Sequence, residues 1–166
     1  MKKIIPIIVA TVVMMMLSSC KEKEEEVYRD KFSPIRLESP DLNLVPDGKL
    51  HLTGNIPKEG LTFTLIPEES DRKLAIVCTV EVNEKFYNCF EIYNETMLKE
   101  NPYPVMTNFK IIEDDWGEIS TDILGSEIYA INVTINENLT GEIRNFEIFL
   151  EGYFFFHRYV ILNQDA

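Results

Sequence analysis

The chain has 166 residues, a formal net charge of −12 at pH 7 and a hydrophobic fraction of 45%. This length suits one domain, with or without a tail, and excludes a two-domain enzyme. The hydrophobic fraction supports a packed core, which excludes global disorder. An acidic surface repels phosphate backbones and no basic patch interrupts this one, so we expect no nucleic-acid partner.

The first nineteen residues have the layout of a secretory signal peptide. Residues 1–3 carry two lysines, residues 4–17 are almost wholly apolar, and Ser18 and Ser19 are small. This order of charged, apolar and small residues is typical of a cleaved leader. An uncleaved membrane anchor is the alternative. It is disfavoured because the apolar run is shorter than the roughly 20 residues that a spanning helix needs.

The segment Leu17-Ser18-Ser19-Cys20 resembles the lipobox of bacterial lipoproteins. That resemblance implies cleavage before Cys20 and lipid on its thiol and amine, which makes the membrane a partner through several acyl chains. The acidic run after Cys20 resembles the surface-export signal of Bacteroidetes-type lipoproteins, with a solvated charged tether as the alternative. We therefore expect a lipid-anchored protein of the outer membrane, exposed at the cell surface if the export signal operates.

Residues 20–46 are expected to form a tether. They hold the charge run and three prolines, with one short edge strand near residues 35–37. From residue 47 onward, short alternating segments recur between turn residues. The predicted strands cover residues 50–53, 61–65, 74–82, 86–93, 105–112, 128–135, 146–150 and 160–162. Their number and spacing predict an all-β sandwich over residues 47–166.

Cys78 and Cys89 lie on the two arms of one predicted hairpin. A two-residue loop at residues 83–84 places them opposite each other and makes a disulfide feasible. A three-residue loop at residues 83–85 places Val82 opposite Phe86 and puts the cysteines on opposite faces. The hydrophobic pattern favours the second register, so we expect no bridge.

The last third of the chain resembles a BACON-type domain. The resemblance lies in alternating segments at residues 131–136 and 146–148, with Asn138, Arg144 and Gln164 at turn and strand ends. It implies an immunoglobulin-like antiparallel β-sandwich. It also implies that Arg144 braces a turn and that the Gln164 amide bonds backbone. The family has been proposed to bind glycans or to act as a spacer.

Catalytic and metal-binding motifs are absent from the sequence. It contains no P-loop, nucleophile elbow, paired-histidine zinc motif or Cys-x-x-Cys. His51 and His157 each lie on a predicted strand without ligand spacing, and packing is their usual role. We therefore expect no catalytic residue, cofactor or metal, and we do not expect an enzyme.

The most suggestive feature is a run of aromatic residues before the last strand. With Val160 and Leu162 facing inward, the period of two turns alternate residues outward. The candidate ligand surface comprises Phe149, Tyr153, Phe155 and Tyr159, with Trp116 as a further member. An exposed aromatic patch marks a binding surface. The alternative is that these rings pack beneath the tether, within the second sheet or at an oligomer contact.

These features predict a non-catalytic binding module at the cell surface, with a glycan as the expected ligand. The alternative is a structural or assembly subunit of a cell-surface complex that binds a protein partner through an open strand edge.

Overall fold

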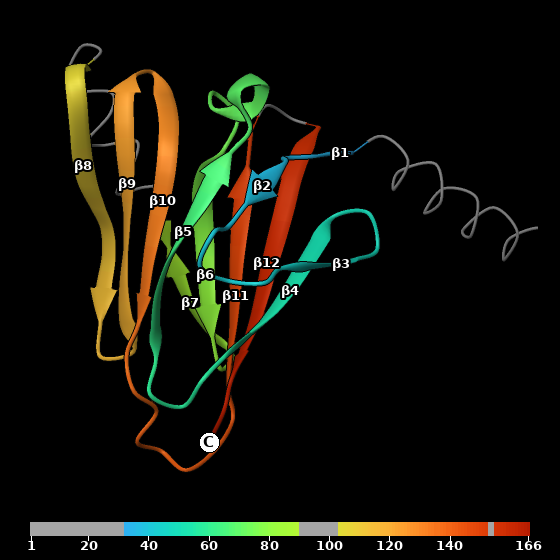
Figure 1. Ribbon diagram of the computed structural model, residues 1–166, viewed down its shortest axis with the longest axis vertical. Helices are drawn as coiled ribbons and strands as arrows, with labels where there is room; N and C mark the ends of the chain where they lie inside the picture. Colours follow the sequence, from blue (N-terminus) through green and yellow to red (C-terminus); the bar gives the residue numbers. More distant parts are fainter. Residues whose placement is uncertain (1–31, 90–102, 153–154) are drawn as a thin grey trace, which may run out of the picture. The chain divides into compact units, whose positions relative to one another are not determined.

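The computed structural model describes residues 32–89, 103–152 and 155–166 (Figure 1). It contains two compact units, Met1–Ser33 and Pro34–Ala166, and the fold below is that of the second. Cys20, the first part of the expected tether (residues 20–31) and Tyr153 lie outside the described residues. Within the described ranges, no helix has the length and apolar character needed to cross a membrane.

One sheet of the second unit has the strand order β3-β4-β12-β11-β6-β7. Its strands are β3 (Val45–Asp47), β4 (His51–Ile56), β12 (Phe156–Gln164), β11 (Arg144–Glu151), β6 (Ile76–Val82) and β7 (Lys85–Asn88). All neighbours run antiparallel except β4 and β12, which run parallel with Tyr159 beside His51. The last strand in the chain is therefore central in its sheet (Figure 1).

The other sheet has the strand order β2-β5-β10-β9-β8. Its strands are β2 (Leu37–Glu38), β5 (Leu61–Pro67), β10 (Glu127–Ile135), β9 (Gly117–Gly125) and β8 (Tyr103–Asp114). A single 3-10 turn, η1 (Glu69–Asp71), follows β5, and β1 (Ser33–Pro34) spans the boundary between the two units.

The strand order is that of an immunoglobulin-like sandwich. Immunoglobulin domains place strands A, B, E and D in one sheet and C, F and G in the other. Here β2-β5-β10-β9 follow the first order and β6-β11-β12 follow the second. The predicted all-β, immunoglobulin-like fold is thus confirmed, with β8 as an added edge strand and one parallel pair that the antiparallel prediction did not include.

The core lies between the two sheets and follows from strand alternation. In β11 from Phe146 to Glu151, and in β10 from Ile131 onward, every second residue is buried and the neighbours between them are partly exposed; an irregularity near Ile128 and Ala130 interrupts the pattern in β10. The largest fully buried side chains are Phe63, Phe146, Ile35, Ile56, Leu65, Ile119, Ile123, Ile128, Ile131, Ile135, Ile148 and Leu150. The alternation also fixes which side chains of each strand face away from the core.

β9 and β3 were not among the predicted strands, whereas the short edge strand predicted near residues 35–37 corresponds to β2 at the end of its sheet. β9 carries buried Ile119, Thr121 and Ile123 at alternate positions, which is the period-two pattern of a strand. The turn that precedes it obscured this pattern in the sequence. Residues 34–46, which the sequence assigns to the tether, contribute β2 and β3, and Ile35 is fully buried.

The β6–β7 hairpin has the two-residue loop, so the three-residue register predicted from hydrophobicity is wrong. Glu81 lies opposite Phe86 and Val82 opposite Lys85. Asn83 and Glu84 both have positive φ, as a type I′ turn requires to match strand twist. The hydrophobic pattern misled because Phe86, on an end strand of the described sheet, is 70% exposed.

Both cysteines are nevertheless free, as expected, although for a different reason. Thr79 pairs with Phe149 and Val77 pairs with Leu150, so Cys78 is the extra residue of a β-bulge. Cys89 belongs to the core cluster, whereas Cys78 does not. The bulge takes Cys78 out of the regular pairing of β6 with β11, and its thiol bonds to Glu151 instead of forming a bridge.

A buried polar anchor joins the start of the second unit to both sheets. Asp71 is 4% exposed and accepts hydrogen bonds from the Arg36 backbone N–H at 2.8 Å and the Arg36 Nε at 3.1 Å. Burial alone raises a carboxyl pKa, but the bonds from Arg36 and Ser70 hold the pKa of Asp71 below its ordinary value. From the other sheet, the buried Arg158 donates to the Ile35 carbonyl at 2.7 Å.

At one end of the sandwich, Asn138, Arg144 and Gln164 form one hydrogen-bonded network. The Arg144 guanidinium donates to Gln164 Oε1 at 3.2 Å and to Asn138 Oδ1 at 3.4 Å. The Gln164 amide donates to the carbonyls of Asn136 and Lys58, at 2.8 and 3.2 Å. The expected structural roles of Arg144 and Gln164 are confirmed, because these bonds satisfy buried polar groups.

Candidate functional site

The candidate site is a set of four rings on the outer face of the β4-β12-β11 sheet, which we call the aromatic cluster. Its members are His51 on β4, His157 and Tyr159 on β12, and Phe149 on β11. Each is partly exposed, and the strand neighbours of Phe149 and Tyr159, among them Val160, are buried. The alternation of β11 and β12 therefore directs these rings away from the core.

Ladder pairing brings the rings into contact. Tyr159 lies opposite Phe149 on one side and His51 on the other. The Phe149 and Tyr159 centroids are 4.7 Å apart with planes at 26°, and the Phe149 and His157 centroids are 5.6 Å apart at 11°. His51 continues the series, 4.9 Å from Tyr159. The result is a continuous ridge of rings across the three neighbouring strands β4, β12 and β11.

Carboxylates flank the aromatic cluster on β11. Glu147 and Glu151 lie two residues before and after Phe149, on the same face. Burial raises the pKa of Tyr159, and the nearby negative charges of Glu147 and Glu151 raise it further. The phenol is consequently neutral at physiological pH and able to donate a hydrogen bond, while the carboxylates supply acceptors.

The thiols near the site are unsuited to nucleophilic chemistry. The Cys78 thiol donates to Glu151 Oε2 at 3.3 Å. Burial, followed by that hydrogen bond and the Glu151 charge, raises the pKa of Cys78 to about 12, and burial raises the pKa of Cys89 to about 11. Because the thiolate is the reactive form, both thiols are inert at neutral pH.

The structure unites some of the predicted ligand residues and separates others. It brings Phe149 and Tyr159 together, leaves Phe155 exposed at 55% just before β12, and does not describe Tyr153. The inclusion of Trp116 is corrected. It is 5% exposed and packs edge-on against Phe146, with centroids 5.6 Å apart. Its ring belongs to the core because β9 begins directly after it and turns it inward.

Sequence reasoning did not place His51 in the site. His51 reaches the aromatic cluster through the parallel pairing of β4 with β12, which joins residues more than a hundred positions apart. A local pattern reports which face a residue takes but not which distant strand lies beside it. The outward alternation of His51 with Leu52 was the available signal.

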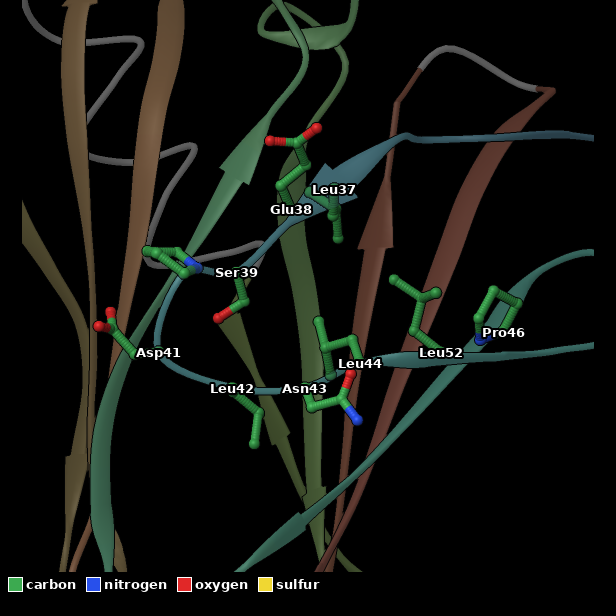
Figure 2. Close-up of a pocket in the computed structure, with 10 residues that line it drawn as sticks. Leu37, Glu38, Ser39, Asp41, Leu42, Asn43, Leu44, Pro46 and Leu52 are labelled. Carbon is green, nitrogen blue, oxygen red and sulfur yellow. The ribbon is translucent and has the colours of Figure 1, made fainter.

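A hollow of about 640 Å³ lies beneath the segment that joins β2 to β4. Figure 2 shows Leu37, Leu44 and Leu52 directed into it, with Ser39 and Asn43 on the joining loop. Leu42 and Leu44 approach Gly54 so closely that a Cβ there would lie 3.4 and 3.1 Å from them. Because Leu42 belongs to the core cluster, Leu37 and Leu44 pack against it and Leu52 is buried, we assign the hollow a packing role.

Within the described ranges, no group of three His, Cys, Asp or Glu side chains is arranged to hold a metal ion.

Comparison with known proteins assigns the chain to no family. No protein-family profile matches it, and no curated protein matches it. Among solved structures, it is similar to an NMR structure of a protein from Bacteroides thetaiotaomicron. The two share 18% identity over 78% of this chain and 86% of that chain, with a TM-score of 0.47.

Proposed function

We propose that this protein is a non-catalytic binding module that holds a glycan on the aromatic cluster. The observation that carries the proposal is the stacked, partly exposed ridge of Phe149, Tyr159 and their two histidine neighbours, flanked by carboxylates. Sugars present apolar C–H faces that pack on aromatic side chains, and their hydroxyls donate to carboxylates. A ridge on a rigid sheet also orders few side chains on binding.

The proposal is tested by titrating a panel of oligosaccharides against the wild-type chain and the variants Phe149→Ala and Tyr159→Ala. We expect at least a tenfold loss of affinity in each variant, about 1.4 kcal/mol or more. Tyr129→Ala is the matched control, because Tyr129 is a half-buried tyrosine of the other sheet. Binding that survives in both cluster variants would refute the proposal.

The proposed location is the outer membrane, with lipid on Cys20. The lipobox resemblance at residues 17–20 supports it. Fractionation of cells that carry wild-type chain or Cys20→Ala tests it: we expect the wild type with membranes and the variant in the soluble fraction. A variant that still sediments with membranes would show that Cys20 is not the anchor.

A second candidate function is assembly with a protein partner through a strand edge. Apolar side chains are exposed on the strands that end each described sheet: Phe86 on β7, and Val105 and Met106 on β8. Such edges pair with other chains. Phe86→Lys and Val105→Lys should abolish cross-linking to a membrane partner while leaving glycan binding intact, and unchanged cross-linking would exclude this candidate.

A further inference from the structure

The face that carries the aromatic cluster is acidic across its whole width. Ladder pairing places four acids on this outer face, from the three strands β3, β6 and β11. They are Asp47 opposite His51, Glu81 opposite Glu147, and Glu151 opposite His157. The outward strand positions of β3, β4, β12, β11 and β6 hold no lysine or arginine.

The basic residues closest to this face along the chain lie off it. Arg158 is buried and donates to the carbonyls of Ile35 and Lys49. Lys85 pairs with inward-facing Val82, and its ammonium lies 3.4 Å from Asp114. Lys49 lies in the turn that precedes β4. Arg144, at the start of β11, lies two residues before the inward Phe146, on the same face, and donates to Gln164 and Asn138. The described part of the face therefore has a surplus of negative charge around the aromatic cluster.

Two of these carboxylates also face each other. Glu81 on β6 and Glu147 on β11 are direct cross-strand partners. Like charges in that position destabilise a sheet, and a cation between or beside them relieves the repulsion. A bound positive charge is thus favoured twice, through attraction to the four acids and through relief of this pair.

We propose that the ligand of the aromatic cluster is an amine-bearing glycan, a sugar chain with free, protonated amino groups. Charge complementarity favours this ligand. Its sugar rings pack on Phe149 and Tyr159, while its ammonium groups pair with Glu147 and Glu151. The inference rests on the proposed glycan-binding function and narrows its ligand. A neutral sugar leaves these carboxylates without a charged partner.

The test compares a glucosamine oligomer with an N-acetylglucosamine oligomer of the same length, by calorimetry at pH about 6, where carboxylates and sugar amines are both charged. We expect the amine oligomer to bind at least tenfold more tightly. The difference should shrink as salt rises from about 0.05 to about 0.5 M. In the double variant Glu147→Gln, Glu151→Gln it should largely disappear, whereas Glu59→Gln, in the turn before β5, should preserve it.

The outcomes distinguish failure of the preference for amine-bearing sugars from failure of the proposed glycan binding. Equal affinity for the two oligomers, with loss of both in Phe149→Ala, would overturn the amine preference and leave glycan binding standing. Absence of binding by either oligomer or any other sugar would remove both. If a lysine oligomer bound as tightly as the amine sugar and was equally sensitive to Phe149→Ala, the site would recognise charge rather than a glycan. That result would also overturn the inference.

Discussion

Phe146 and Phe149 lie on the same strand but on opposite faces, and they allow the assignment of core and site to be tested with one substitution type. Phe146 is 2% exposed and packs edge-on against Trp116. Phe149 is partly exposed within the aromatic cluster. We predict that Phe146→Ala is strongly destabilising, whereas Phe149→Ala mainly impairs binding.

The magnitudes follow from burial. Truncation of a buried phenylalanine costs about 3–5 kcal/mol, which includes loss of the edge-on contact to Trp116. With a urea dependence of about 2 kcal/mol/M, the unfolding midpoint of Phe146→Ala falls by about 2 M. Phe149→Ala loses part of a surface contact and two stacked neighbours, about 1 kcal/mol, which moves the midpoint by about 0.5 M.

The assay is urea unfolding followed by tryptophan fluorescence and by circular dichroism. Trp116 is the one tryptophan of the chain, so its emission reports directly on the core. Coincident transitions from the two probes justify a two-state treatment. Equal losses of stability in the two variants, or a Phe146→Ala midpoint within about 0.5 M of wild type, would refute the assignment of faces on β11.

Three further predictions concern the rest of the fold. The pKa of Asp71 is lowered on folding, so the ionised carboxylate stabilises the fold at neutral pH, and this stabilisation is lost as pH falls below the ordinary pKa of 3.8. Asp71→Asn should therefore lower stability at pH 7 and flatten the acid limb of a series of thermal melts. Gly117 has a positive φ, and a Cβ added to it would overlap the Thr134 carbonyl. Gly117→Ala should therefore lower the free energy of unfolding in urea by at least about 2 kcal/mol. A midpoint equal to that of the wild type would contradict this. Because burial raises the pKa of Cys78 and Cys89, both should react with a thiol reagent at pH 8 at least about a hundredfold more slowly in the native chain than in the unfolded chain. Rapid labelling of the native chain would show that burial does not protect these thiols.

Strand faces could be predicted from the sequence because they depend on a local period of two. The outward direction of Tyr159 followed from inward Val160 and Leu162, and that of Phe149 from inward Ile148 and Leu150; the structure confirms both. Their meeting with His51 could not be predicted, because it depends on a parallel pairing between strands far apart in the chain. Local periodicity does not determine distant partners.

Two predictions failed where a tertiary constraint outweighed a local pattern. The hairpin register follows the turn: Asn83 accepts a hydrogen bond from the Asn145 backbone at 2.8 Å, and its own backbone N–H donates to the Asn145 carbonyl at 3.1 Å. This anchorage to β11 accommodates an exposed Phe86. Trp116, which the sequence left open between the candidate ligand surface and packing, is directed into the core by the strand that begins after it.

The central position of β12 has a consequence for how the chain can fold. β12 pairs with β11 on one side and with β4 on the other, so the sheet that carries the aromatic cluster stays in two parts until residues 156–164 are present. Until then β4 and β11 expose unpaired edges, which are prone to aggregation. Pairing across this sequence distance also slows folding. A chain halted before β12 should therefore remain unfolded rather than form a partial domain, and the binding face cannot form before this last strand is available.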